Sequence, residues 1–411
     1  MPSTNTDARP GRPQLLREIN DRAALRVMLE RGPLTRPELG ALTGLSKPTA
    51  SQLLARLRSA GLVVLDGVRE GLPGRTAELY RINPAAAHVA ALDVTRTRIA
   101  ASVADITGAV LGDHLHPTPG RSGGDVVAKV RAAVEGACLR AGVTSDDLHR
   151  VVIGIQGAVD PATARLGYAA HIPGWHIPDL AGTLREGLGV PVDIENDVNL
   201  VALTERSHGV ARGHADFVLL WADEGIGAAL VLGGRLHRGA TGGAGEVGYM
   251  PIAGAPTAKE TGKRGDHGFQ ALAGGPAVLR MLRSHGLRGG DPSRAVRAAV
   301  RDAAREGERG ERACRALREL AARLAVGLAP IVAVADPEIV VLTGGMLLAG
   351  GDVLSALVEE ELHALTLPRP PVRLSAVEGS PVLTGALGLA LSVTREEVFG
   401  STVSTRAAGP A

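Results

Sequence analysis

The chain has 411 residues, of which 45% are hydrophobic and 21% are charged, and its net charge is +2. This length exceeds what one hydrophobic core supports, and this composition excludes a disordered or collagen-like protein. The two cysteines lack metal or redox spacing, and no apolar run reaches membrane-spanning length, which predicts a reduced, cytoplasmic protein of several domains that engages no membrane.

Charge is distributed unevenly along the chain. Residues 1–82 carry 13 Lys and Arg against 8 Asp and Glu, a net charge of +5, so the remainder is slightly acidic. A basic first segment joined to an acidic body is typical of a nucleic-acid-binding module attached to a second function. We expect residues 1–14 to be a disordered tail and residues 15–83 to form this module.

The module begins with apolar residues at helical spacing over 15–31. Thr35 and Glu38 have the spacing of a capping box that starts a short helix, and Gly44 ends that helix in a tight turn. Ser46 caps a second helix. Two helices joined by a Gly-containing turn, with polar residues at the start of the second, form the helix–turn–helix layout.

The second helix exposes side chains suited to DNA contact. Gln and Ser reach base edges, whereas Lys and Arg contact phosphates. Residues 62–82 then predict a β wing, whose tip would enter a minor groove. An ordinary helical hairpin with a charged surface is the plainer alternative, but the wing and the positive bias together favour DNA binding. The predicted DNA-binding residues are Ser46, Lys47, Thr49, Ser51, Gln52, Arg56 and, at the wing tip, Arg75.

The rest of the chain alternates between apolar strands and helices. We expect strands over 88–116, a helix over 124–141, a buried strand at 151–160, a strand entering a helix over 190–209, a hairpin over 217–239, helices over 271–286, 292–306 and 311–326, and a strand, Gly-Gly turn and helix over 337–362. This order repeats in outline. It predicts two related α/β lobes around a cleft, where ligands bind at the carboxyl ends of strands.

Three segments carry a family resemblance: "IENDVN" at 194–199, "GRLHRGATGGAGEVG" at 234–248 and "IVVLTGG" at 339–345. In this order and spacing they resemble the ROK family (repressors, open reading frames, kinases), specifically its regulators with an N-terminal winged helix. The resemblance covers about residues 15 to 395. It implies an α/β chain with an N-terminal winged helix–turn–helix followed by a two-lobed actin/hexokinase-like ATPase fold.

The resemblance also implies the domain limits. The small lobe would span residues 86–200 and be completed by about 375–395, and the large lobe would span 201–374. Residues 396–411 would be a disordered C-terminal tail.

The sugar half of the family's site is largely present. Asp197 matches the residue that takes the proton from the sugar hydroxyl in kinase members, and Asn196 matches the preceding sugar contact. Glu246 matches the hydroxyl-binding Glu of the family. The effector-binding residues implied are Asn196, Asp197 and Glu246, with Gly157 in the turn that lines the cleft and with Tyr249 and Gln270 as further candidates.

The phosphate half of the family's site differs. Kinase members have an Asp-x-Gly-Gly-Thr-Lys loop, whereas side chains occupy both glycine positions in 93–98 here. Their second loop, Gly-Thr-Gly-x-Gly, carries Asp223 and Glu224 in this chain. A carboxylate about 4 Å from a phosphate oxygen costs about 4 kcal/mol at an effective dielectric constant of about 20. We therefore expect no ATP binding and no cofactor, and Asp197 would be catalytic only in a kinase.

The zinc site of some family members is also altered. Tyr249 stands where their ligating His would be, and no cysteine follows in 250–275. We therefore expect no metal.

These features predict a sugar-responsive repressor of carbohydrate-utilisation genes, whose partners are a double-stranded DNA operator and a sugar or sugar derivative. The resemblance and the two-fold symmetry of operators imply a homodimer or higher homo-oligomer. Two alternatives stay open: an ATP-dependent sugar kinase, alone or combined with DNA binding, and an architectural DNA-binding protein without an effector.

Overall fold

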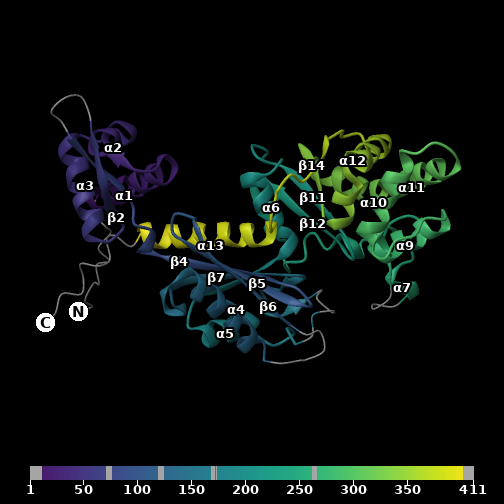
Figure 1. Ribbon diagram of the computed structural model, residues 1–411, viewed down its shortest axis with the longest axis horizontal. Coiled ribbons are helices and arrows are strands. Elements are labelled where there is room, and N and C mark those ends of the chain that lie inside the picture. Colours follow the sequence, from purple (N-terminus) through teal and green to yellow (C-terminus); the bar gives the residue numbers. More distant parts are fainter. Residues whose placement is uncertain are drawn as a thin grey trace, which may run out of the picture.

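The computed structural model describes residues 12–70, 76–118, 125–167, 172, 174–261 and 266–400. Figure 1 shows a small domain at one end, a lobe in the middle and a second lobe at the other end. One long helix, α13 (Pro381–Gly400), runs from the side of the second lobe toward the small domain. No helix in these ranges is both long and apolar enough to cross a membrane.

The first domain is the predicted winged helix. Its elements are α1 (Arg12–Arg31), β1 (Leu34–Thr35), α2 (Arg36–Thr43), α3 (Lys47–Ser59), β2 (Val63–Glu70) and β3 (Thr76–Ile82). The strands form one sheet in the order β1-β3-β2, and antiparallel β2 and β3 make the wing. Leu25, Leu39, Leu53 and Leu57 are fully buried between the helices and the sheet.

Local capping explains where these helices begin. The Thr35 hydroxyl accepts a hydrogen bond from the Glu38 N–H at 3.4 Å, and the Glu38 carboxylate accepts one from the Thr35 N–H at 2.8 Å, so the capping box is confirmed. Gly44 ends α2 at a φ of +70°, a backbone conformation that glycine adopts without strain. Ser46 caps α3 by accepting from the Thr49 N–H.

The small lobe contains a five-stranded sheet in the order β10-β7-β4-β5-β6. Its elements are η1 (Pro84–Ala86), β4 (His88–Val94), β5 (Arg98–Asp105), β6 (Val110–Pro117), α4 (Val126–Ala141), η2 (Ser145–Asp147), β7 (Leu148–Ile155), β8 (Ala158–Val159), β9 (Leu166–Gly167), α5 (Leu180–Leu188) and β10 (Val192–Asn196). Alternate residues of β4 point to opposite faces: Ala90 and Leu92 pack against α4 and α5, and Val89 and Ala91 pack against α6 (Asp197–His208) and α13 (Pro381–Gly400).

The large lobe repeats this topology with the order β13-β12-β11-β14-β15. Its elements are β11 (Phe217–Ala222), β12 (Ile226–Leu232), β13 (Arg235–His237), η3 (Val247–Tyr249), α7 (Ala258–Thr261), α8 (Gly268–Ala273), α9 (Gly275–Ser284), α10 (Pro292–Ala303), α11 (Glu308–Ala335), β14 (Ile339–Thr343), α12 (Gly345–Leu365) and β15 (Val372–Leu374). In both lobes a three-stranded antiparallel meander is followed by two strands that join in parallel. The predicted repeat is therefore confirmed.

The structure corrects several predicted boundaries. The predicted tail of residues 1–14 is too long, because α1 begins at Arg12, while residues 1–11 lie outside the described ranges. The predicted C-terminal tail begins too early, because α13 continues to Gly400 and buries Phe399 in the core of the winged helix, while residues 401–411 lie outside the described ranges. The helix predicted over 271–286 is two helices, because Gly274 between them is extended.

α13 connects the lobes to the winged helix. It packs along α6 and under the small-lobe sheet, and its last turn reaches the winged-helix core, where Phe399 is 5% exposed (Figure 1). Near that end, Arg395 Nε donates to the carbonyl oxygen of Ile106 at 2.9 Å. The small lobe and the winged helix are therefore joined by α13 as well as by the segment of chain between β3 and β4.

Candidate functional site

The central feature is the carboxyl end of β10, where the chain turns directly into α6. Asn196 is the N-cap of α6: its Oδ1 accepts from the Asn199 N–H at 3.1 Å. Its Nδ2 donates to the carbonyl oxygen of Gly157 at 3.0 Å. Gly157 has a φ of +91°, which favours glycine at this turn. The two residues predicted separately as site residues therefore lie side by side.

Asp197 follows Asn196 as the first residue of α6. Its Oδ1 accepts from the Val198 N–H at 2.9 Å, which fixes the carboxylate at the start of the helix. Burial, and secondarily the negative charge of Asp93, raise the pKa of Asp197 to about 6. Asp93 lies at the end of β4 and is itself 9% exposed. The sequence analysis gave Asp93 no role in the sugar site. Asp93 lies near the end of β4, which pairs with β7, and β7 pairs with β10; this position could have indicated that it lies near Asp197.

Glu246 approaches from the large lobe at the end of a glycine-rich loop over 239–245. A Cβ on Gly245 would lie 2.1 Å from the carbonyl oxygen of Ala228, and one on Gly242 would lie 2.8 Å from that of Val159 in the small lobe. Both glycines also have positive φ. Glycine is therefore required where the loop passes between the two lobes.

The Glu246 carboxylate lies close enough to Asp197 for their charges to interact. Burial, and secondarily the negative charge of Asp197, raise the pKa of Glu246 to about 7. The site thus brings together carboxylates from both lobes: Asp197 accepts backbone hydrogen bonds at the start of α6, whereas the Glu246 carboxylate accepts none from the described residues. Hydroxyl groups of a ligand would supply the missing hydrogen-bond donors.

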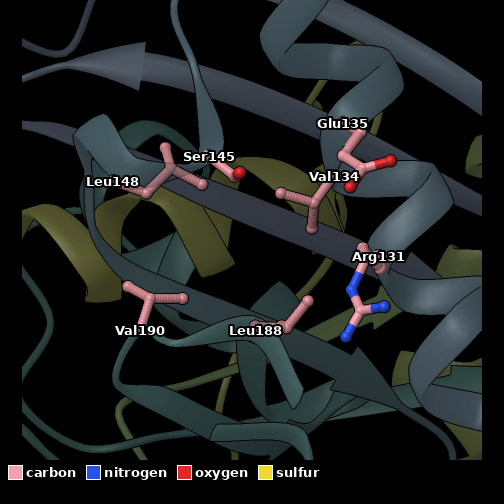
Figure 2. A pocket seen from close by; sticks show the side chains of 7 residues that line it. All are labelled: Arg131, Val134, Glu135, Ser145, Leu148, Leu188 and Val190. Carbon is pink, nitrogen blue, oxygen red and sulfur yellow. The ribbon is translucent and has the colours of Figure 1, made fainter. Parts of the chain in front are cut away.

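Two cavities differ in their relation to this site. One of about 330 Å³ opens between the β8–β9 hairpin and Thr241 of the glycine loop; Ala158, Asp160, Thr163, Arg165, Leu166, Gly167 and Thr241 line it. The other, of about 60 Å³, lies beside α4, where Arg131, Val134 and Glu135 face Leu148, Leu188 and Val190 (Figure 2). Ligand pockets usually measure at least about 300 Å³, so of these two cavities only the first has the volume of a sugar site, although none of the predicted sugar contacts lines it.

Ser46, Lys47, Thr49, Ser51 and Gln52 lie at the start of α3, whereas Arg56, predicted for its first turns, lies in its last turn. Ser46, Lys47 and Gln52 are exposed, whereas Thr49 and Ser51 are half-buried and bond to neighbouring residues of the same helix turn. Arg56 has a structural partner: its Nη2 lies 2.7 Å from the buried carboxylate of Asp21 in α1. Arg75 lies outside the described residues.

A model of the ROK family matches residues 89–392. The chain belongs to the ROK family. A MarR-family model matches residues 20–74, so this ROK protein joins a MarR-type winged helix to its family domain. The two-lobed actin/hexokinase-like architecture expected from the sequence is thereby confirmed.

Relatives of this ROK protein include regulators and kinases. It is 24% identical to a xylose repressor of Caldicellulosiruptor bescii over 81% of this chain and 84% of that protein. It is 29% identical to a glucokinase of Streptomyces coelicolor over 65% of this chain and 84% of that protein. The crystal structure of a ROK family transcriptional regulator, a homologue of the E. coli MLC protein, matches with a TM-score of 0.73 and 19% identity, covering 95% of this chain and 99% of that one.

Gln270 has a different position from the one expected of a sugar contact. Its Oε1 accepts from the Ile226 N–H at 2.9 Å, and its Nε2 donates to the carbonyl oxygen of Glu224 at 2.9 Å. The amide therefore fixes the turn between β11 and β12. Tyr249 is 46% exposed, and its ring centroid lies 5.5 Å from that of His267.

The segment that holds zinc in other family members is fixed here by packing and backbone bonds. The Gly268 N–H donates to Pro256 at 2.8 Å, and the Phe269 N–H donates to Met250 at 3.0 Å, beside the ring contact of Tyr249 with His267. Within the described ranges, no three His, Cys, Asp or Glu side chains are grouped so that they could hold a metal ion.

The turn between β11 and β12, which corresponds to the second phosphate loop, carries the carboxylate of Asp223. Asp223 accepts hydrogen bonds from the Ser293 hydroxyl at 3.4 Å and from the N–H of Gly345 at the start of α12. Burial, the largest cause, raises the pKa of Asp223. A side-chain anion therefore occupies a helix N-terminus, which is a preferred place for anions in proteins.

Proposed function

We propose that this ROK protein is a sugar-responsive repressor of carbohydrate-utilisation genes. Its winged helix would bind an operator through the start of α3, and a sugar would bind between the lobes. The observation that carries the proposal is the meeting of Asp197 and Glu246 from opposite lobes, in a chain that also has a MarR-type winged helix. The repressor among the relatives supports this reading.

The proposed sugar contacts are Asn196, Asp197 and Glu246. Asn196 keeps one amide hydrogen for a ligand after its bond to Gly157, and the two carboxylates accept bonds from hydroxyl groups. Gly157 would shape the turn beneath the sugar, and Tyr249 would contribute at the exposed rim. For Gln270 we propose support of the 223–226 turn in place of a sugar contact.

The route from sugar to DNA would run through two helices. α6 begins at Asp197 and packs along α13, whose last turn is part of the winged-helix core. A sugar that binds one arrangement of the lobes more tightly would therefore shift the position of the DNA-reading domain. A coupling of about 1–3 kcal/mol changes operator affinity about 5- to 150-fold.

We further propose that the protein acts in the cytoplasm as a homodimer and has no kinase activity. The anionic turn at Asp223 and Glu224 supports the lack of kinase activity, because its charges oppose those of a bound nucleotide. The glucokinases among the relatives make kinase activity the alternative to test. Turnover in an ADP-release assay across aldohexoses and pentoses, abolished by Asp197→Asn, would replace the repressor reading with that of an enzyme.

The test of the proposed function is operator binding by the full chain. Binding fragments are first selected from random duplexes, and fluorescence anisotropy then measures their affinity with and without sugars. We expect at least one sugar to weaken binding. Operator affinity that no sugar alters would favour an architectural DNA-binding protein.

A further inference from the structure

Glu195 occupies a nearly buried position next to the proposed sugar contacts. Its side chain is 9% exposed, and its Oε1 accepts from Asn199 Nδ2 at 2.8 Å and from the Asn196 N–H at 3.0 Å. Its Oε2 accepts from Arg238 Nε at 2.6 Å. The Glu195 carboxylate therefore accepts hydrogen bonds from the end of β10, from the first turn of α6 and from an arginine of the large lobe.

Arg238 stands at the base of the glycine loop that ends in Glu246. Its carbonyl oxygen accepts from the Ala244 N–H at 3.1 Å, which closes the loop on itself. Its guanidinium group, with the side chain 48% exposed, reaches Glu195. The same residue thus fixes the shape of the loop and ties it to the small lobe.

We propose that Glu195 and Arg238 are positioning residues, an ion pair that joins the two lobes and sets Glu246 opposite Asn196 and Asp197. The inference rests on the proposed sugar site. Its physical basis is geometric: Arg238 stands at the base of the loop that ends in Glu246, and its guanidinium group bonds the carboxylate of Glu195, the residue directly before Asn196 and Asp197. A charge-assisted hydrogen bond to a nearly buried carboxylate is also among the stronger polar contacts in proteins.

The first experiment needs no sugar. Hydrogen exchange followed by mass spectrometry compares loop residues 239–248 in the wild-type chain, in Arg238→Met and in Arg235→Met. Arg235 lies on β13, is exposed, and its side chain makes no hydrogen bond or ion pair within the described ranges, so it is the matched control. We expect exchange to be at least about tenfold faster in Arg238→Met and unchanged in Arg235→Met. Equal exchange in all three proteins would overturn the inference.

The second experiment asks whether the pair serves the site. Isothermal titration calorimetry with D-xylose and D-glucose measures affinity in Glu195→Gln, Arg238→Met and the double variant. Removing one strong contact should weaken binding about tenfold, and the double variant should bind as weakly as either single one, because both remove the same pair. Additive losses in the double variant, or unchanged affinity despite a loosened loop, would contradict a positioning role.

The two experiments separate this inference from the proposed function. If the wild-type chain binds no sugar, the proposed function fails, yet exchange in 239–248 still decides whether the pair holds the loop. If sugar binds equally well to all variants, the proposed function stands and the positioning role is wrong. The conservative Glu195→Gln, which keeps an oxygen for Asn199 and Asn196, guards against loss of the fold as the cause.

Discussion

We expect the substitution Glu246→Gln to raise the free energy of unfolding at high pH while it removes sugar binding. Burial and the charge of Asp197 raise the pKa of Glu246 from 4.5 to about 7. Between these pH values, Glu246 is therefore protonated in the folded state and ionised in the unfolded state. The free energy of unfolding therefore falls as pH rises from 4.5 to about 7 and stays low above it. Over this interval the loss is at most about 3.5 kcal/mol, at about 1.4 kcal/mol per pH unit.

A glutamine at this position carries no charge at any pH. We therefore expect Glu246→Gln to match the wild type near pH 4.5 and to exceed its stability at pH 8 by about 1–3 kcal/mol, since partial exposure screens the charge. Urea unfolding followed by circular dichroism measures this difference. Glu378→Gln is the control, because Glu378 is exposed and has no hydrogen bond within the described ranges; its effect should stay within about 0.5 kcal/mol.

The same variant should lose sugar binding while gaining stability. In the wild type, sugar affinity should rise with pH through about 7, because the ionised carboxylate is the better acceptor for hydroxyl groups. A Glu246→Gln protein that is less stable than the wild type at pH 8 would refute the account of a poorly compensated carboxylate.

Four further substitutions test other parts of the structure. Phe399→Ala should lower the free energy of unfolding by about 3–5 kcal/mol and reduce the effect of sugar on operator affinity, and an unchanged effect would exclude coupling through α13. Gly245→Ala should abolish sugar binding, because the new Cβ would lie 2.1 Å from the Ala228 carbonyl oxygen, and wild-type affinity in calorimetry would contradict this. Lys47→Ala should weaken binding to all duplexes alike and lower the salt dependence, whereas Gln52→Ala should relax base preference at one position, as anisotropy on single-base operator variants would reveal.

Features set by neighbouring residues could be predicted from the sequence. The Thr35–Glu38 capping box and the cap at Ser46 depend on residues three apart, and both occur as expected. The repeat of two related α/β lobes was predicted from the order of apolar runs, but the number of strands in each sheet was not. Asn196 and Gly157 lie 39 residues apart, and the family resemblance, not local pattern, predicted that both line the site.

Features that depend on tertiary contact were missed or misplaced. Phe399 lies in a polar stretch near the chain end, and only the winged-helix core 300 residues away explains its burial. Gln270 was assigned to the sugar because of its place in the sequence, but its amide binds a turn 44 residues earlier. The pair of Glu195 and Arg238, 43 residues apart and on different lobes, had no local signal at all.

The most direct test of the account is the affinity of the full chain for its selected operator, measured with and without each sugar of a panel at constant salt. We predict that one neutral sugar weakens binding by about 5- to 150-fold, that Glu246→Gln removes this response, and that no ADP is released with ATP and the same sugar. Operator affinity that every sugar leaves unchanged, together with sugar-dependent ADP release faster than about 1 s⁻¹, would contradict the account and identify a kinase.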